Sequence, residues 1–220
     1  MNFQTVIKTI SKIDGYKDQN LHKIIIKLMK KACFTTNLSE PDLLHKLDFQ
    51  PNNLTNEMIE GFLAQLRAIF WLKRFGFSNI IPIEPTRRFP QPDFLANYKG
   101  KKSAIEVFCL TKTHEQQKDQ TLNVYVNFSP QFKGSKFGRD FMSKALLKKR
   151  QLDSISAEIK VLLCVINSTP IIALNDKKDI KEMTKFLYDK LNWGKNYFIG
   201  VLTGWNSFGV LDDTIYPKLH

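Results

Sequence analysis

The sequence predicts an α/β fold in which a mixed β-sheet is flanked by helices and preceded by a helical extension. Three observations lead to this prediction. Helical periodicity dominates the chain up to Gly76, a β-hairpin is expected around Gly100, and helix and strand patterns then alternate. That order is typical of a mixed sheet with helices on both faces. We expect an N-terminal helical extension at 1–53 and the main domain at 54–220.

The N-terminal half is predicted to be helical. Leu21–Cys33 carries apolar residues at helical spacing with lysines on its other faces, and Ser39 has the position of a helix N-cap with Pro41 in the first turn. After a turn at 51–53, a longer helix is expected from Thr55 to Phe75. Its apolar positions are broad enough for a largely buried helix, and Gly76 ends it.

The remaining elements follow from local patterns. Lys99-Gly100-Lys101 predicts a tight turn between two strands, and the continuous apolar run at Lys160–Ile166 is typical of a strand buried on both faces. The strands are expected at Asn79–Glu84, Phe94–Tyr98, Ser103–Leu110, Lys160–Ile166, Tyr197–Thr203 and Ser207–Ile215, and the helices at Arg139–Gln151 and Asp176–Leu191.

The composition points to a polyanionic partner. The chain has 33 Lys and Arg against 21 Asp and Glu, a formal net charge of +12, which suits nucleic acid or an anionic surface. No stretch has the length of a membrane span, and Met1–Ile10 lacks the apolar core of a signal peptide. The three cysteines have no metal-ligand spacing and are interpreted as free thiols in a reducing compartment. We therefore expect a cytoplasmic protein that does not associate with membranes.

The hairpin carries the most informative residues. Asp93 follows Pro92 at the start of the first strand and Glu106 lies in the middle of the return strand, so folding at Gly100 brings the two acids together. Paired carboxylates on an apolar hairpin commonly hold a hard divalent cation such as Mg²⁺ or Mn²⁺, with the Val107 carbonyl as a third ligand. The alternative is a solvated hairpin that carries two unrelated acids.

This segment resembles the core motif of the PD-(D/E)xK nuclease superfamily, which has the restriction-endonuclease-like fold. Pro92-Asp93 and Glu106-Val107 match the motif, whereas Phe108 stands where the lysine is expected. The resemblance covers roughly residues 55–215. It implies a metal-dependent DNA endonuclease, with a restriction or defence role. It also implies a further acid on the helix before the hairpin, where Gln65 stands. We favour Gln65 by its position and keep Glu60, the nearest acid upstream, as the alternative by chemistry.

The missing lysine has several candidates. Lys112 lies on the strand of Glu106 but far along it, whereas in some members of the superfamily the following helix supplies the lysine. We favour Lys148 on that helix, with Lys144 one turn earlier, and the alternative is a basic face that grips phosphate. Six further basic residues are expected to contact nucleic acid beside Lys144, namely Arg87, Arg88, Lys133, Lys136, Arg139 and Lys149.

Two other expectations concern the functional class. The long connection from Thr113 to Gly138 interleaves basic and aromatic residues, which suits a loop that grips nucleic acid, although a solvated flap fits equally. The four histidines have no zinc-ligand spacing. The alternative to an active nuclease is a catalytically degenerate module that binds nucleic acid or a protein partner without cleavage. A homodimer would suit double-strand cutting.

Overall fold

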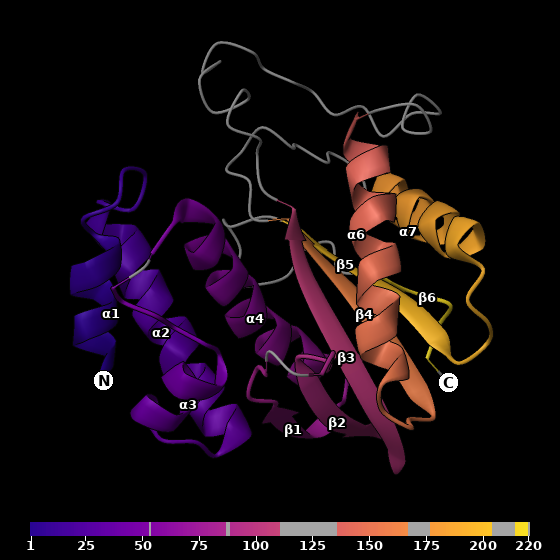
Figure 1. Cartoon of the computed structure of the whole chain (residues 1–220), viewed down its shortest axis with the longest axis horizontal. Helices are drawn as coiled ribbons and strands as arrows, with labels where there is room; N and C mark the ends of the chain where they lie inside the picture. The colour runs from indigo at the N-terminus through magenta and orange to yellow at the C-terminus, as the bar shows by residue number, and fades with distance from the viewer. Residues whose placement is uncertain (53, 87–88, 111–135, 167–176, 204–213, 220) are drawn as a thin grey trace.

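The computed structural model describes residues 1–52, 54–86, 89–110, 136–166, 177–203 and 214–219 (Figure 1). Its helices are α1 (Phe3–Ile10), α2 (Gln19–Thr36), α3 (Glu40–Lys46), α4 (Asn56–Arg74), α6 (Lys136–Asp153) and α7 (Lys177–Leu191). Its strands are β1 (Ser78–Pro82), β2 (Phe94–Tyr98), β3 (Lys101–Leu110), β4 (Ile159–Ile166), β5 (Tyr197–Thr203) and β6 (Thr214–Tyr216). The expected α/β class with a mixed sheet is confirmed.

The strands form one six-stranded sheet in the order β1-β2-β3-β4-β5-β6. The pairs β1–β2, β2–β3 and β5–β6 are antiparallel, whereas β3–β4 and β4–β5 are parallel. Parallel neighbours require crossover connections, and α6 and α7 lie in the two crossovers that join β3 to β4 and β4 to β5. The centre of the sheet is therefore covered by helices.

Helices cover both faces of the sheet, as Figure 1 shows with α1–α4 on one side and α6 and α7 on the other. Side chains alternate along β3 between the two layers: Ile105 and Val107 pack with the α4 side, whereas Ala104 and Phe108 pack with the α6 side. Glu106 lies between Ala104 and Phe108 in this alternation. The sheet thus directs an acid toward the α6 layer of the core.

The N-terminal helices share the core of the main sheet. Phe3, Ile25 and Leu43, from α1, α2 and α3, belong to the same buried cluster as Trp71 of α4 and Phe94 of β2. The predicted cap of α3 is present, since the side chain of Ser39 accepts a hydrogen bond from a backbone N–H in the first turn. Thr55 caps α4 in the same way. Residues 1–52 are thus a helical layer of this fold, packed against α4 and β1.

The hairpin turn has the geometry that its sequence predicts. Lys99 and Gly100 have φ angles of 49° and 82°, and Tyr98 pairs with Lys101 across the turn. Two central residues with positive φ define the tight turn that matches the twist of an antiparallel pair. The register continues through Phe94 opposite Ile105, which places the next pair, Asp93 and Glu106, opposite each other at the end of the ladder.

Several element bounds differ from expectation by two or three residues, and those of α6 and β1 are examples. α6 begins at Lys136 instead of Arg139, because Gly138 is tolerated in a first helical turn, where its weak propensity costs little. β1 ends at Pro82, and its pairing with β2 is interrupted between Ser78 and Ile81, where Asn79 has a φ of 49°. The segments 111–135 and 207–213 lie outside the described residues. They include most of the long connection from Thr113 to Gly138, which was expected to contact nucleic acid, and the first part of the last predicted strand.

Within the described part of the chain, none of the helices combines the length and the apolar character that crossing a bilayer requires.

Gly200 of β5 is expected to be essential for close packing. A Cβ atom added there would lie 2.8 Å from Leu163 Cδ1 and 3.0 Å from the ring of the buried Trp71. Gly200→Ala should therefore lower the free energy of unfolding by about 1–3 kcal/mol, measured by urea denaturation. In the control, Gly61→Ala within α4, the added Cβ meets nothing within 4 Å. That variant should be neutral or stabilised by up to about 1 kcal/mol. Equal stability of the two variants would contradict the packing described here.

Candidate active site

The two hairpin acids meet where β2 begins. The carboxylate oxygen Oδ2 of Asp93 accepts a hydrogen bond of 2.7 Å from the backbone N–H of Val107, and the backbone N–H of Asp93 donates to Glu106 Oε2 at 3.2 Å. Because the β2–β3 ladder stops at Phe94, each of these bonds between Asp93 and β3 joins a backbone N–H to a side-chain carboxylate, in place of a backbone ladder bond. The reciprocal bonds hold the two carboxylates next to each other.

Gln65 reaches the same place from α4. Its side-chain Nε2 donates to Asp93 Oδ1 at 2.9 Å, so both oxygens of Asp93 accept a hydrogen bond within the protein. Gln65 is partly buried on a helix that packs against β1, β3 and β4. The amide therefore orients the Asp93 carboxylate and connects the α4 layer to the hairpin.

Lys148 reaches the site from the opposite layer. It lies on α6 between Ala145 and Leu152, which are fully buried and mark the face of the helix that packs on the sheet. Its Nζ donates to Glu106 Oε1 at 2.5 Å. The Glu106 side chain is 0% exposed and that of Lys148 is 29% exposed, so the lysine shields the acid from solvent while part of it remains accessible.

Burial dominates the electrostatics of the pair of acids. The pKa of Glu106 is raised well above its usual value by burial, with the charge of Asp93 adding to the effect, and Lys148 only partly offsets it. Burial also raises the pKa of Asp93, against the charge of Lys148 and the hydrogen bond from Val107. Burial acts to lower the pKa of Lys148, but Glu106 and Asp93 outweigh it and raise that pKa. Lys148 is therefore a cation at neutral pH.

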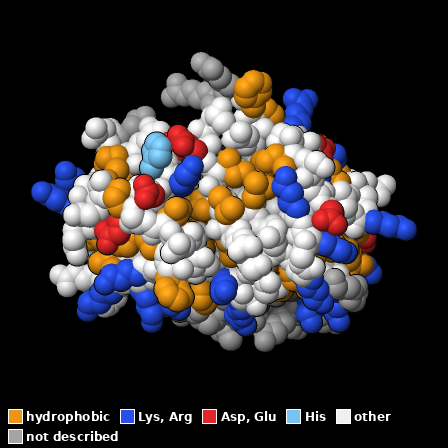
Figure 2. All heavy atoms as spheres, turned by 90° about the horizontal axis from the view of Figure 1, so that it is seen from below, with side chains coloured by type: hydrophobic (Ala, Val, Ile, Leu, Met, Phe, Trp, Pro, Cys, Tyr) orange, Lys and Arg blue, Asp and Glu red, His pale blue; other side chains and the backbone are white. Residues whose placement is uncertain are grey.

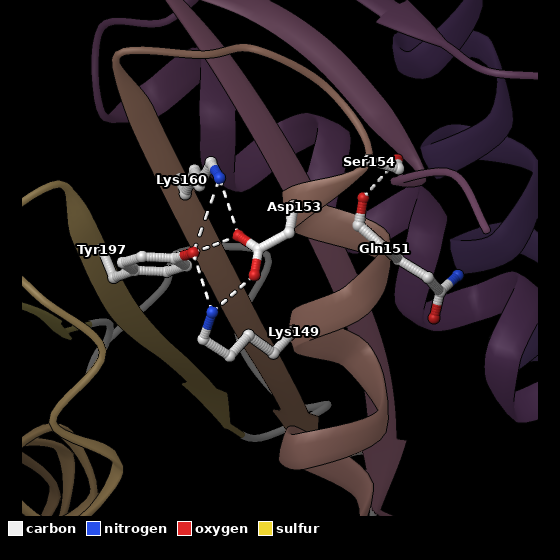
Figure 3. Close-up of polar contacts among 6 residues, drawn as sticks. All are labelled: Lys149, Gln151, Asp153, Ser154, Lys160 and Tyr197. Atoms are coloured by element: carbon white, nitrogen blue, oxygen red, sulfur yellow. Dashed lines mark hydrogen bonds and ion pairs between the residues drawn. The ribbon is translucent and has the colours of Figure 1, made fainter.

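A polar network anchors the C-terminal end of α6 to the sheet, as Figure 3 shows. Asp153 accepts hydrogen bonds from Lys149 at 2.5 Å, from Lys160 at 2.7 Å and from the hydroxyl of Tyr197. Lys160 and Tyr197 lie at the starts of β4 and β5, so the network joins the helix to two strands. Burial would raise the pKa of Asp153, but these three hydrogen bonds lower it to about 2.

Gln151 holds the other side of α6. In Figure 3 its side chain points away from the Asp153 network, and its Nε2 donates to the backbone carbonyl of Gln91 at 3.0 Å. Gln91 stands two residues before Asp93, so this bond links α6 to the segment that leads into the site. The helix is held on both sides close to Lys148, which restricts the position of the ammonium group.

Glu60, the acid considered as an alternative to Gln65, has a different partner. Its carboxylate accepts a hydrogen bond from the hydroxyl of the buried Tyr16, which precedes α2. Burial and the charge of Glu60 raise the pKa of Tyr16. Glu60 thus joins α4 to the N-terminal layer, and Gln65 is the residue of α4 that contacts Asp93.

The other predicted contact residues are distributed as follows. Lys144 is exposed one turn before Lys148, and Lys149 is engaged by Asp153 and Tyr197 on another face of α6. Lys136 and Arg139 lie in the first turn of α6, with side chains outside the described set. Arg87, Arg88, Lys112 and Lys133 lie outside the described residues. Phe108, at the expected lysine position, packs in the buried cluster between the sheet and α6.

Three residues of the α6 network, Asp153, Lys160 and Tyr197, were not predicted from the sequence. Asp153 follows Lys149 at the i+4 spacing of a helical ion pair, which was a usable local signal. Its contacts with β4 and β5 had no local signal, because they depend on how the helix docks on the strands.

Replacing Lys148 should make stability depend more steeply on pH. In Lys148→Met, Glu106 loses its cation and its folded-state pKa rises further, so the folded state binds more protons than the unfolded state above about pH 4.5. The variant should therefore lose stability relative to wild type as the pH rises, by about 1–3 kcal/mol at pH 8. Urea midpoints between pH 5 and 8 would measure this. The exposed Lys144→Met is the matched control, and identical pH profiles for the two variants would contradict the ion pair.

Replacing Asp153 should change the pH dependence of stability in a lower pH range. Its folded-state pKa is depressed, so its contribution to stability is present above about 3.8 and is lost as the pH falls through about 2. Asp153→Asn should therefore be less stable than wild type at pH 7, with a difference that shrinks toward pH 3 in denaturant titrations. Asp14→Asn, at an exposed surface pair with Lys17, should change little at either pH. A constant deficit for Asp153→Asn across this range would exclude its charge as the cause.

Comparison with known proteins identifies no relative from which the site could be interpreted. No family model matches the chain, and searches of curated proteins and of solved structures return no significant match.

Proposed function

We propose that the chain is a divalent-metal-dependent DNA endonuclease with the restriction-endonuclease-like fold of the PD-(D/E)xK superfamily. The observation that carries this proposal is the convergence of Asp93, Glu106 and Lys148 from three separate elements at one partly accessible place. Two acids and a lysine are the side chains that the superfamily motif requires. The sheet order, with an antiparallel hairpin continued by parallel strands and their crossover helices, is compatible with that fold.

The donor set fits Mg²⁺ or Mn²⁺. Each of the four carboxylate oxygens accepts one hydrogen bond, from Gln65, Val107, Asp93 or Lys148, which leaves roughly half of their lone-pair sites available. Among the described residues, no group of three or more His, Cys, Asp and Glu side chains is placed to hold a metal. Two carboxylates are sufficient for Mg²⁺, which keeps several waters and binds substrate phosphates.

Asp93 and Glu106 would hold the cation, with the Val107 carbonyl as the third ligand that the motif implies. When bound, it would polarise the scissile phosphate and lower the pKa of an attacking water. Burial is the main cause of the raised pKa values of both acids, and for Glu106 the charge of Asp93 adds to it. A further cation beside the two carboxylates would favour their ionised forms.

Lys148 and Gln65 supply the remaining functions. Because Lys148 is protonated and partly exposed, it would stabilise the charge that develops on the phosphate and would not act as a base. Gln65 keeps Asp93 in one orientation without adding charge. Phe108 contributes packing in place of the motif's lysine, and Lys148 would perform that lysine's role from α6.

Glu106→Gln should abolish cleavage without destabilising the protein. The substitution removes a charge that burial disfavours, and the Lys148 side chain, at 29% exposure, can be solvated, so the urea midpoint at pH 7.5 should stay close to that of wild type. Nicking of supercoiled plasmid in Mg²⁺ or Mn²⁺ should fall by at least about 100-fold, to the level seen for wild type with chelator.

The control is Glu57→Gln, an exposed acid in the first turn of α4, which should cut at the wild-type rate. Normal cutting by Glu106→Gln would refute the assignment. Wild-type protein that shifts DNA in a salt-sensitive manner but does not cut it in either metal would favour the binding module without catalysis.

A further inference from the structure

Helix α2 carries positive charge without any acid. Its sequence from Gln19 to Thr36 contains four lysines and no Asp or Glu, although the chain as a whole has 21 acids for 33 basic residues. The four lysines, Lys23, Lys27, Lys30 and Lys31, are all exposed. A solvated helix usually mixes both signs of charge, so this helix differs from an ordinary surface helix.

Three of these lysines lie on one line. Lys23, Lys27 and Lys30 follow one another at intervals of four and three residues, which places them on a single face of the helix. With a rise of 1.5 Å per residue they span about 10 Å, at steps of about 4.5–6 Å. One strand of duplex DNA carries a phosphate about every 3.4 Å along its axis, so these steps correspond to a phosphate at every one or two nucleotides.

Phe34 extends the same line. It follows Lys30 by four residues, and at 89% exposure it is the most exposed of the large apolar side chains that the structure describes. An aromatic side chain beside lysines suits contact with the sugars or bases of nucleic acid. In Figure 2, Lys and Arg side chains lie along the lower left edge of the molecule, at the end formed by the N-terminal helices.

The burial pattern favours nucleic acid over a membrane surface. A helix that lies on a membrane inserts an apolar face into the lipid. The apolar face of α2, formed by Ile25, Leu28, Met29 and Ala32, is buried in the protein core instead. What α2 presents outward is a row of cations with a single aromatic ring.

We propose that α2 is a docking surface for the phosphate backbone of duplex DNA, formed by Lys23, Lys27 and Lys30 with Phe34 at its end. This inference rests on the proposed action on DNA and assigns part of the binding energy to the N-terminal layer. The surface would contact duplex independently of sequence, because lysine contacts to phosphate carry no base information. Lys31, which lies over the ring of Phe70 at 4.7 Å, adds to the positive potential of this helix.

The test is the salt dependence of binding to a fluorescent 30-base-pair duplex, measured by anisotropy in chelator so that cleavage plays no part. The triple variant Lys23→Gln, Lys27→Gln and Lys30→Gln should bind at least about tenfold more weakly at 100 mM salt. The slope of log K against log salt should decrease in magnitude by up to about 2.7, which is about 0.9 for each phosphate that a lysine no longer neutralises. Phe34→Ala should weaken binding without changing the slope.

The matched control is Lys99→Gln, Lys101→Gln and Lys102→Gln in the hairpin, which removes the same charge at the end of the hairpin remote from Asp93. Equal slopes for the two triple variants, with unchanged thermal unfolding, would overturn the inference. The inference would also be overturned if the α2 triple variant lost binding to anionic phospholipid vesicles but bound DNA as the wild type does.

The two proposals fail separately. A wild-type protein that cuts plasmid while both triple variants bind duplex alike would refute the α2 surface and leave the nuclease assignment intact. If the wild-type protein does not cut, and salt-sensitive binding to duplex is lost in the α2 variant but kept in the hairpin variant, the results would support the α2 surface and refute catalysis.

Discussion

The fully buried carboxylate of Glu106 is the constraint on which the described site depends. An acid in the middle of a central strand is costly unless charges and donors surround it. Here Lys148 arrives from one layer, the backbone N–H of Asp93 arrives from the neighbouring strand, and Gln65 steadies Asp93 from the other layer. Each of these groups is a hydrogen-bond or charge partner of another, so removing one leaves a buried polar atom without that partner. The contacts of Glu106 and Asp93 therefore connect the sheet to both helical layers.

The position of Lys148 is determined by the docking of its whole helix. Ala145 and Leu152 pack α6 on the sheet, the Asp153 network joins its end to β4 and β5, and Gln151 connects it to the segment before Asp93. A long, flexible side chain is thus supported by a helix held on several sides. This arrangement suits a site in which the ammonium group must stay close to one carboxylate while part of it remains accessible, as expected for contact with a phosphate.

The N-terminal helices form part of the same structure instead of an appended module. They contribute to the buried cluster that contains Trp71 and Phe94, and the hydrogen bond between Tyr16 and Glu60 joins them to α4. Because α4 also carries Gln65, the N-terminal layer supports the helix that orients Asp93. The proposed DNA surface on α2 would lie on that layer, so that substrate binding and the orientation of Asp93 would depend on the same packing.

The features that could be predicted from the sequence are those that local chemistry controls. Positive φ at Lys99 and Gly100 sets the hairpin register, and that register alone brings Asp93 opposite Glu106. Local periodicity likewise predicted the bounds of β5 and, within a residue, those of α4. For the residues that complete the pair of acids, the family resemblance favoured Gln65 and Lys148, but their contacts with the acids are visible only in the folded protein. Gln65 and Glu60 both lie on α4, and Lys144 and Lys148 both lie on α6. The choice within each pair depends on how the helix is rotated against the sheet. That rotation is set by apolar packing between segments far apart in the sequence, as for Lys148 and Glu106, which are 42 residues apart.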